Sequence, residues 1–154
     1  MSIADYTAQA ALAAIKTELD GGFLYLFAGP VPADADDALD MDTLHTQIVM
    51  FSKDGDGVTG LTFASPSGNG MAKSPSEVWE GTIGFDGAED DEETLTPTFW
   101  RFCQAGDDGR GEAIGPRLQG TAGGPTTDIP CGAQTDNGTN TLSVDTFAVI
   151  LDAA

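Results

Sequence analysis

The stretch GGFLYLFAGPVPADADDALDMD, Gly21 to Asp42, carries the clearest indication of a β fold in this sequence. Six apolar residues, Phe23 to Ala28, follow two glycines and are too few and too aromatic for a helix. Gly29 and Pro30 stop the run, and the chain then becomes acidic. The order predicts a buried strand over residues 23–28 that ends abruptly in an acidic surface loop.

The rest of the chain repeats short apolar runs separated by turn residues. Segment 76–87, SEVWEGTIGFDG, alternates apolar and polar side chains and so predicts a strand with one buried face. Glycine is abundant, at 20 residues, which favours many turns and few long helices. Together with the first strand, the runs predict about seven strands, the others being 44–52, 60–65, 76–87, 96–106, 113–120 and 139–152. This spacing is typical of an antiparallel β-sandwich or jelly-roll-like domain.

One helix is expected at the start of the chain, over residues 2–20. Its apolar residues recur every three and four positions and form one narrow stripe: Ala8, Ala11, Leu12, Ile15 and Leu19. Gly21 and Gly22 supply the stop. We therefore expect a mainly β, single domain over 1–154, with an N-terminal α-helix in 1–21 and a β-sandwich in 22–152.

The charge limits the kinds of partner. The chain has 25 acidic and 6 basic residues, a formal net charge of -19. Such a surface repels phosphate and anionic lipid, so we expect no direct nucleic acid binding and no membrane binding. A halophilic protein would carry a similar surface, and this alternative stays open.

Export and disulfide formation are not expected from the sequence. No run of about 20 apolar residues is present, which predicts no membrane span. The N-terminal segment lacks a basic region and carries acids at Asp5, Glu18 and Asp20, which predicts no signal peptide. Cys103 and Cys131 are then expected to be reduced.

No pattern of residues indicates catalysis, a cofactor or a metal site. The DGDG segment at 54–57 lacks the later ligands of a calcium loop, so it predicts a turn. His45 is the only histidine and precedes an apolar run, which favours a structural role. We therefore expect a non-enzymatic protein without cofactors. Trp79 and Trp100 are expected in the core, and the Gly/Thr-rich segment 120–140 as a long functional or disordered loop.

Three blocks of the chain, in order, resemble a family of small virion structural proteins of tailed bacteriophages. The first runs from the N-terminal helix through GGFLYLFAGPVPADADDA to the strand LHTQIVMF. The second is TPTFWRFCQAGDDGRGEAIGPRLQG, and the third is TLSVDTFAVIL. The acidic load, the EDDEE segment and the Gly/Thr-rich segment 120–140 depart from the family pattern.

The resemblance implies a capsid decoration (cement) protein of a phage head. Its expected partner is the major capsid protein, it would be a homo-oligomer, dimer or trimer, on the capsid surface, and it would be made in the host cytoplasm. Alternatives are a neck or tail component, or a carbohydrate-binding module on the particle. The candidate partner-contact residues are Ile3, Tyr6, Asp34, Asp36, Asp37 and Asp40.

Overall fold

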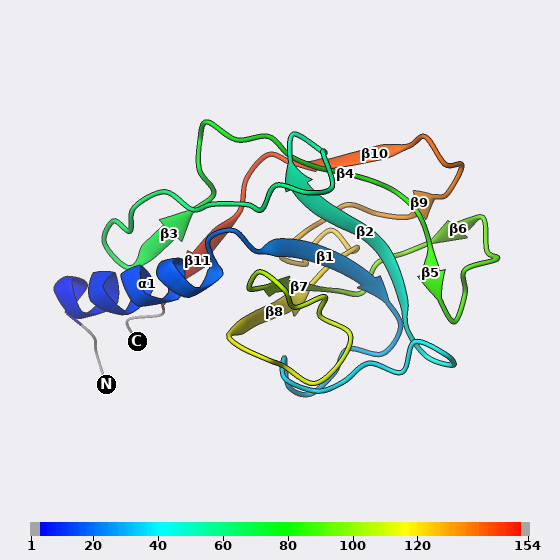
Figure 1. Ribbon diagram of the computed structural model, residues 1–154, viewed down its shortest axis with the longest axis horizontal. Coiled ribbons are helices and arrows are strands. Elements are labelled where there is room, and N and C mark those ends of the chain that lie inside the picture. Colours follow the sequence, from blue (N-terminus) through cyan, green and yellow to red (C-terminus); the bar gives the residue numbers. More distant parts are fainter. Residues whose placement is uncertain (1–3, 152–154) are drawn as a thin grey trace.

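The computed structural model describes residues 4–151 and is mainly β, with one N-terminal helix (Figure 1). The helix is α1 (Asp5–Leu19). The larger strands are β1 (Phe23–Ala28), β2 (Thr46–Lys53), β4 (Trp79–Thr82), β7 (Phe99–Cys103), β8 (Arg117–Thr121) and β10 (Thr141–Val144). The shorter strands are β3 (Gly70–Ala72), β5 (Asp86–Gly87), β6 (Thr94–Leu95), β9 (Gln134–Thr135) and β11 (Ala148–Ile150).

The main sheet has seven strands and is antiparallel. Its order is β10-β4-β2-β1-β7-β8, with β5 also paired to β2. Strands β11 and β3 form a second, two-stranded sheet, and β6 and β9 form a third. The central position of β1 explains its uninterrupted apolar sequence, because five of its six residues are buried.

The two faces of β1 and β7 belong to two apolar clusters. The larger contains Leu24, Leu26, Trp79 and Phe102, among other side chains. The smaller contains Tyr25, Phe27, Phe99 and Cys103. The stacked rings of Phe27 and Phe99 have centroids 5.2 Å apart, and this smaller cluster lies under the acidic loop that follows β1.

The turn after β1 depends on Gly29. Its φ is 115°, in the region where side chains are strained, and a Cβ atom there would lie 2.3 Å from the Leu44 carbonyl oxygen. Thr98 Oγ1 donates a 2.5 Å hydrogen bond to the Gly29 carbonyl. The chain can therefore leave the sheet abruptly at this residue, as the sequence predicted.

The helix packs on its own domain through part of the predicted stripe. Ala8, Leu12 and Leu19 are buried and Ile15 is half-buried, whereas Ala11 is exposed, so its inclusion was wrong. The helix begins at Asp5, after Ala4, which provides no side-chain cap. Figure 1 shows α1 beside β3 and β11, at one end of the molecule.

The mainly β class, the antiparallel sheets and the N-terminal helix are confirmed, but several local expectations were wrong. Segments 76–87 and 139–152 each form two strands in place of one, β4 with β5 and β10 with β11. Segment 60–65 makes isolated bridges, Gly22 to Leu61 and Phe63 to Lys73, in place of a strand. Segment 120–140 is packed, not loose: Ile129 is buried and residues 134–135 form β9. Within residues 4–151, no helix has the length and apolar character needed to cross a membrane.

Candidate functional site

The acidic loop between β1 and β2, residues 29–45, is held by arginines beneath it. We call it the aspartate loop. Arg101 Nη2 donates to the Asp34 carbonyl at 3.3 Å, and Arg117 Nη1 donates to the Ala35 carbonyl at 3.2 Å. The side chain of Gln119 also reaches the loop, donating to the Pro32 carbonyl at 2.9 Å. The arginines therefore bind the backbone of the loop and leave its carboxylates outside.

One of these two arginines, Arg117, forms a buried ion pair with Asp107. Arg117 and Asp107 meet through two hydrogen bonds of 2.6 Å, and their side chains are 0% and 3% exposed. Burial opposes ionisation of Asp107, but the hydrogen bonds from Arg117 and the Gly109 amide outweigh it and lower the pKa of this carboxyl. Arg101 is fully buried and its hydrogen bonds go to neutral acceptors, the Gln119 side chain and the carbonyls of Gly109 and Asp34, while burial and the nearby Arg117 lower its pKa.

The carboxylates of the aspartate loop are exposed, and some of them also stabilise its turns. Asp34 Oδ1 accepts from the Asp36 amide at 3.0 Å, and Asp37 Oδ2 accepts from the Asp34 amide at 3.2 Å. Asp40 accepts from the Thr43 hydroxyl and amide, which lowers the pKa of Asp40. All four predicted aspartates, Asp34, Asp36, Asp37 and Asp40, thus lie on one exposed loop.

Most of the basic residues are engaged inside the protein. Besides Arg101 and Arg117, Lys16 pairs with Asp20 and Arg110 pairs with Asp86. Lys73 donates to the Glu77 carbonyl. Five of the six basic side chains therefore bind groups of the same chain, and the acidic surface is left with little compensation.

His45 fixes the far end of the aspartate loop. His45 is buried, its Nδ1 accepts from the Asp40 amide at 3.1 Å, and its Nε2 lies 2.8 Å from the Pro30 carbonyl. Both nitrogens bind backbone groups, so the structural role expected for His45 is confirmed. In the described chain, residues 4–151, no group of three or more His, Cys, Asp or Glu side chains could hold a metal ion.

The two remaining predicted contact residues lie at the N-terminus. Tyr6 is 88% exposed, on the first turn of α1. Ile3 lies outside the described residues. The structure thus brings the four aspartates together on one loop and places Tyr6 on the separate helix.

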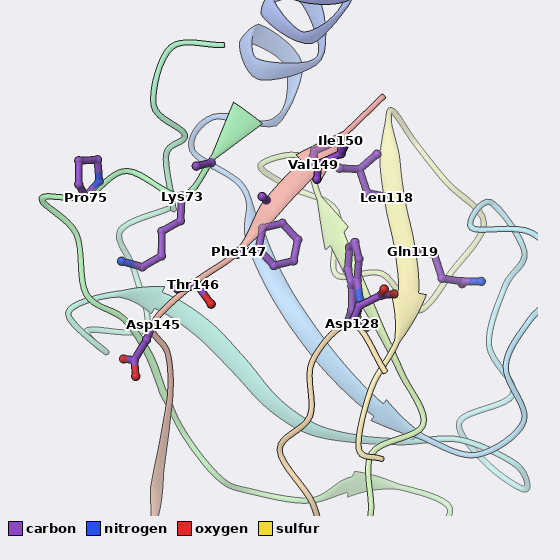
Figure 2. A pocket seen from close by; sticks show the side chains of 13 residues that line it. Lys73, Pro75, Leu118, Gln119, Asp128, Asp145, Thr146, Phe147, Val149 and Ile150 are labelled. Atoms are coloured by element: carbon purple, nitrogen blue, oxygen red, sulfur yellow. The ribbon is translucent and has the colours of Figure 1, made fainter. Parts of the chain in front are cut away.

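A second feature is a groove of about 780 Å³ between β8 and β11 (Figure 2). We call it the β8–β11 groove. Its lining residues are Ala72, Lys73, Pro75, Trp100, Leu118, Gln119, Asp128, Asp145, Thr146, Phe147, Ala148, Val149 and Ile150. Its base is apolar, because Trp100 and Phe147 meet edge to face with centroids 5.0 Å apart and are both largely buried. Its rim carries two exposed carboxylates, Asp128 and Asp145.

Comparison with known proteins adds no family assignment. No family model matches the chain, and neither a curated protein nor a solved structure matches it.

Sequence reasoning missed the arginine network and the groove. A charged residue within FWRFC, as Arg101 is, indicates a buried guanidinium that needs acceptors. The acceptors themselves are mostly backbone carbonyls, which leave no mark in the sequence. The groove brings together strands from distant parts of the chain, and no local pattern of residues predicts that arrangement.

Proposed function

We propose that this chain is a non-enzymatic structural protein of a bacteriophage particle, attached to the head as a decoration protein. The observation that carries the proposal is the division of charge: five of the six basic side chains bind groups of the same chain, and most of the carboxylates, including those of the aspartate loop, face outward. A protein with such a surface favours a basic partner surface and is repelled by exposed phosphate. The order of the three sequence blocks adds the virion context.

The aspartate loop is the proposed contact with the major capsid protein. Its backbone is anchored by Arg101, Arg117 and Gln119, so little conformational entropy is lost when its carboxylates meet a partner. The exposed Tyr6 offers a second contact on α1, where an aromatic ring can be buried against a neighbouring subunit. Attachment as a dimer or trimer would multiply these contacts.

Both tryptophans are buried, Trp79 at 0% and Trp100 at 8% exposure. A carbohydrate-binding platform needs exposed aromatic rings, so this alternative is less well supported than attachment to a protein shell.

The proposal is tested by charge reversal at two matched positions. Asp36 is exposed on the aspartate loop and uses only its backbone in hydrogen bonds, so Asp36→Lys leaves the turn intact. Asp90→Lys makes the same charge change on a neighbouring exposed segment, whose Ala88 amide donates to the His45 carbonyl. We expect Asp36→Lys to weaken attachment to particles lacking the protein by about tenfold more than Asp90→Lys does. Equal effects would remove the aspartate loop as the contact, and absence of the wild-type protein from purified particles would remove the function.

A further inference from the structure

We infer that the β8–β11 groove binds an extended, basic peptide segment of another protein, which adds as a strand beside Gln119 at the edge of β8. This inference concerns a different surface from the aspartate loop. It does not depend on the protein being part of a phage particle.

Strand β8 directs some of its backbone groups away from β7. This strand is at one end of the main sheet, and within residues 4–151 it pairs only with β7. The Thr121 amide binds Asp128 Oδ2 at 2.8 Å and its carbonyl accepts from Ile129, so both groups of Thr121 point away from β7. Because bonding alternates along an antiparallel ladder, Gln119 directs its amide and carbonyl to the same open side.

The open side of Gln119 faces the groove. The Gln119 side chain is engaged elsewhere, with Arg101 Nε at 3.0 Å and the Pro32 carbonyl, and Figure 2 shows it pointing away from Phe147. Gln119 nevertheless lines the groove. Its edge backbone is therefore the part that an added strand would meet.

The opposite wall also presents a strand edge, which pairs with no other strand in the part of the chain that the structure describes. On β11, Phe147 accepts from the Lys73 amide and Leu151 donates to Asn69, so these residues face β3. By the same alternation, Ala148 and Ile150 direct their backbone groups away from β3. The groove is thus bounded by two strand edges, and an added segment would meet backbone groups rather than a closed wall.

The lining determines the chemistry of the segment. Leu118, Phe147 and Val149 form an apolar base, which suits one or two apolar side chains. Asp128 and Asp145 on the rim, together with a net charge of -19, favour flanking Lys or Arg. Lys73, the only basic lining residue, is engaged with the Glu77 carbonyl and the Trp79 ring, so its charge is largely directed into the fold.

The probe is a blocked six-residue peptide that alternates lysine with valine and leucine. Trp100 lines the groove, so its fluorescence reports binding. Two control peptides separate the contributions: one has glutamate in place of lysine, and one keeps every side chain but is N-methylated at alternate amides. We expect saturable binding of the basic peptide and about tenfold or more weakening with either control.

A matched pair of variants tests the edge of β8. Gln119→Ala and Gln119→Pro lose the same side-chain bonds, but only proline also removes the amide that points to the groove. We expect Gln119→Pro to bind about tenfold more weakly than Gln119→Ala, with thermal melts showing that both are folded.

Three binding results would each overturn the inference, and self-association is a fourth. They are no binding of the basic peptide, equal binding of its N-methylated form, and equal binding by the two folded variants. If Gln119→Pro does not fold, the comparison of the N-methylated and unmodified peptides on the wild-type protein decides the question. A self-associated protein whose groove is closed to the peptide also overturns it.

Discussion

Replacing Arg117 by methionine tests whether the buried ion pair holds the aspartate loop. The variant leaves Asp107 buried without its bidentate partner, and the side chain of Asp107 is only 3% exposed. Loss of one member of a buried pair costs about 3–5 kcal/mol, because the remaining charge is uncompensated. The backbone contacts of Arg117 with Ala35 and Gly111 are lost at the same time.

The assay combines urea unfolding with hydrogen exchange of residues 29–45. We expect the free energy of unfolding to fall by about 3–5 kcal/mol and exchange in the aspartate loop to accelerate. The double variant Arg117→Met with Asp107→Leu should recover part of the loss, since an apolar pair carries no uncompensated charge.

Arg110→Met is the matched control. Arg110 also sits next to the aspartate loop and pairs with Asp86, but the two side chains are 29% and 63% exposed. Its loss should cost no more than about 1 kcal/mol. Equal losses for Arg117→Met and Arg110→Met, or unchanged exchange in the loop, would refute the view that the buried pair anchors it.

Three further predictions follow from burial and charge. Tyr6→Ser should leave the free energy of unfolding within about 0.5 kcal/mol of wild type while weakening shell attachment, whereas Leu12→Ala should lower the free energy of unfolding by about 2–5 kcal/mol. A destabilised Tyr6→Ser protein would show that Tyr6 belongs to the core. Because the pKa of Asp107 is lowered in the folded state, its contribution to stability is complete above the unfolded value of 3.8 and is lost as the pH falls below 3.8 through the folded value. Thermal melts from about pH 6 down to about pH 2 should show a larger acid loss in wild type than in Asp107→Asn, in which carboxyls such as Asp40 still titrate, and equal losses would contradict this role of Asp107. Burial raises the pKa of Cys103 to about 12, so a thiol reagent at neutral pH should label the half-buried Cys131 first and Cys103 only after unfolding. If neither cysteine of the unfolded, unreduced protein reacts, the two form a disulfide and the prediction is wrong.

Burial was easier to predict from the sequence than strand pairing. The run 23–28 contains only apolar side chains, and burial of both faces of this segment requires a central position in the sheet. It forms the central strand β1, in which five of six residues are buried. In segment 60–65, Leu61 and Phe63 are buried, as the alternation of apolar and polar residues predicts. Each of these two residues nevertheless forms an isolated β-bridge in place of a continuous strand. Alternation determines which side chains face the core, whereas pairing depends on the path of distant segments.

The sequence predicted that the candidate contact aspartates are exposed, but it did not predict which residues hold their loop in place. The density of aspartates in 34–42 predicted an exposed acidic loop, and the structure confirms its exposure. The reason that the loop keeps its shape lies in Arg101 and Arg117, which come from β7 and β8 and bind its carbonyl groups. Backbone acceptors have no residue signature, so this anchoring could only be found in three dimensions.

An electron-microscopy reconstruction of virus particles released by cells that express this chain tests the central proposal most directly. We expect density for this fold in many copies on the outer face of the shell, with the aspartate loop against basic residues of the major capsid protein. Density confined to a single ring at the neck or tail would contradict the decoration role. Absence of the protein from the particle would contradict the virion role altogether.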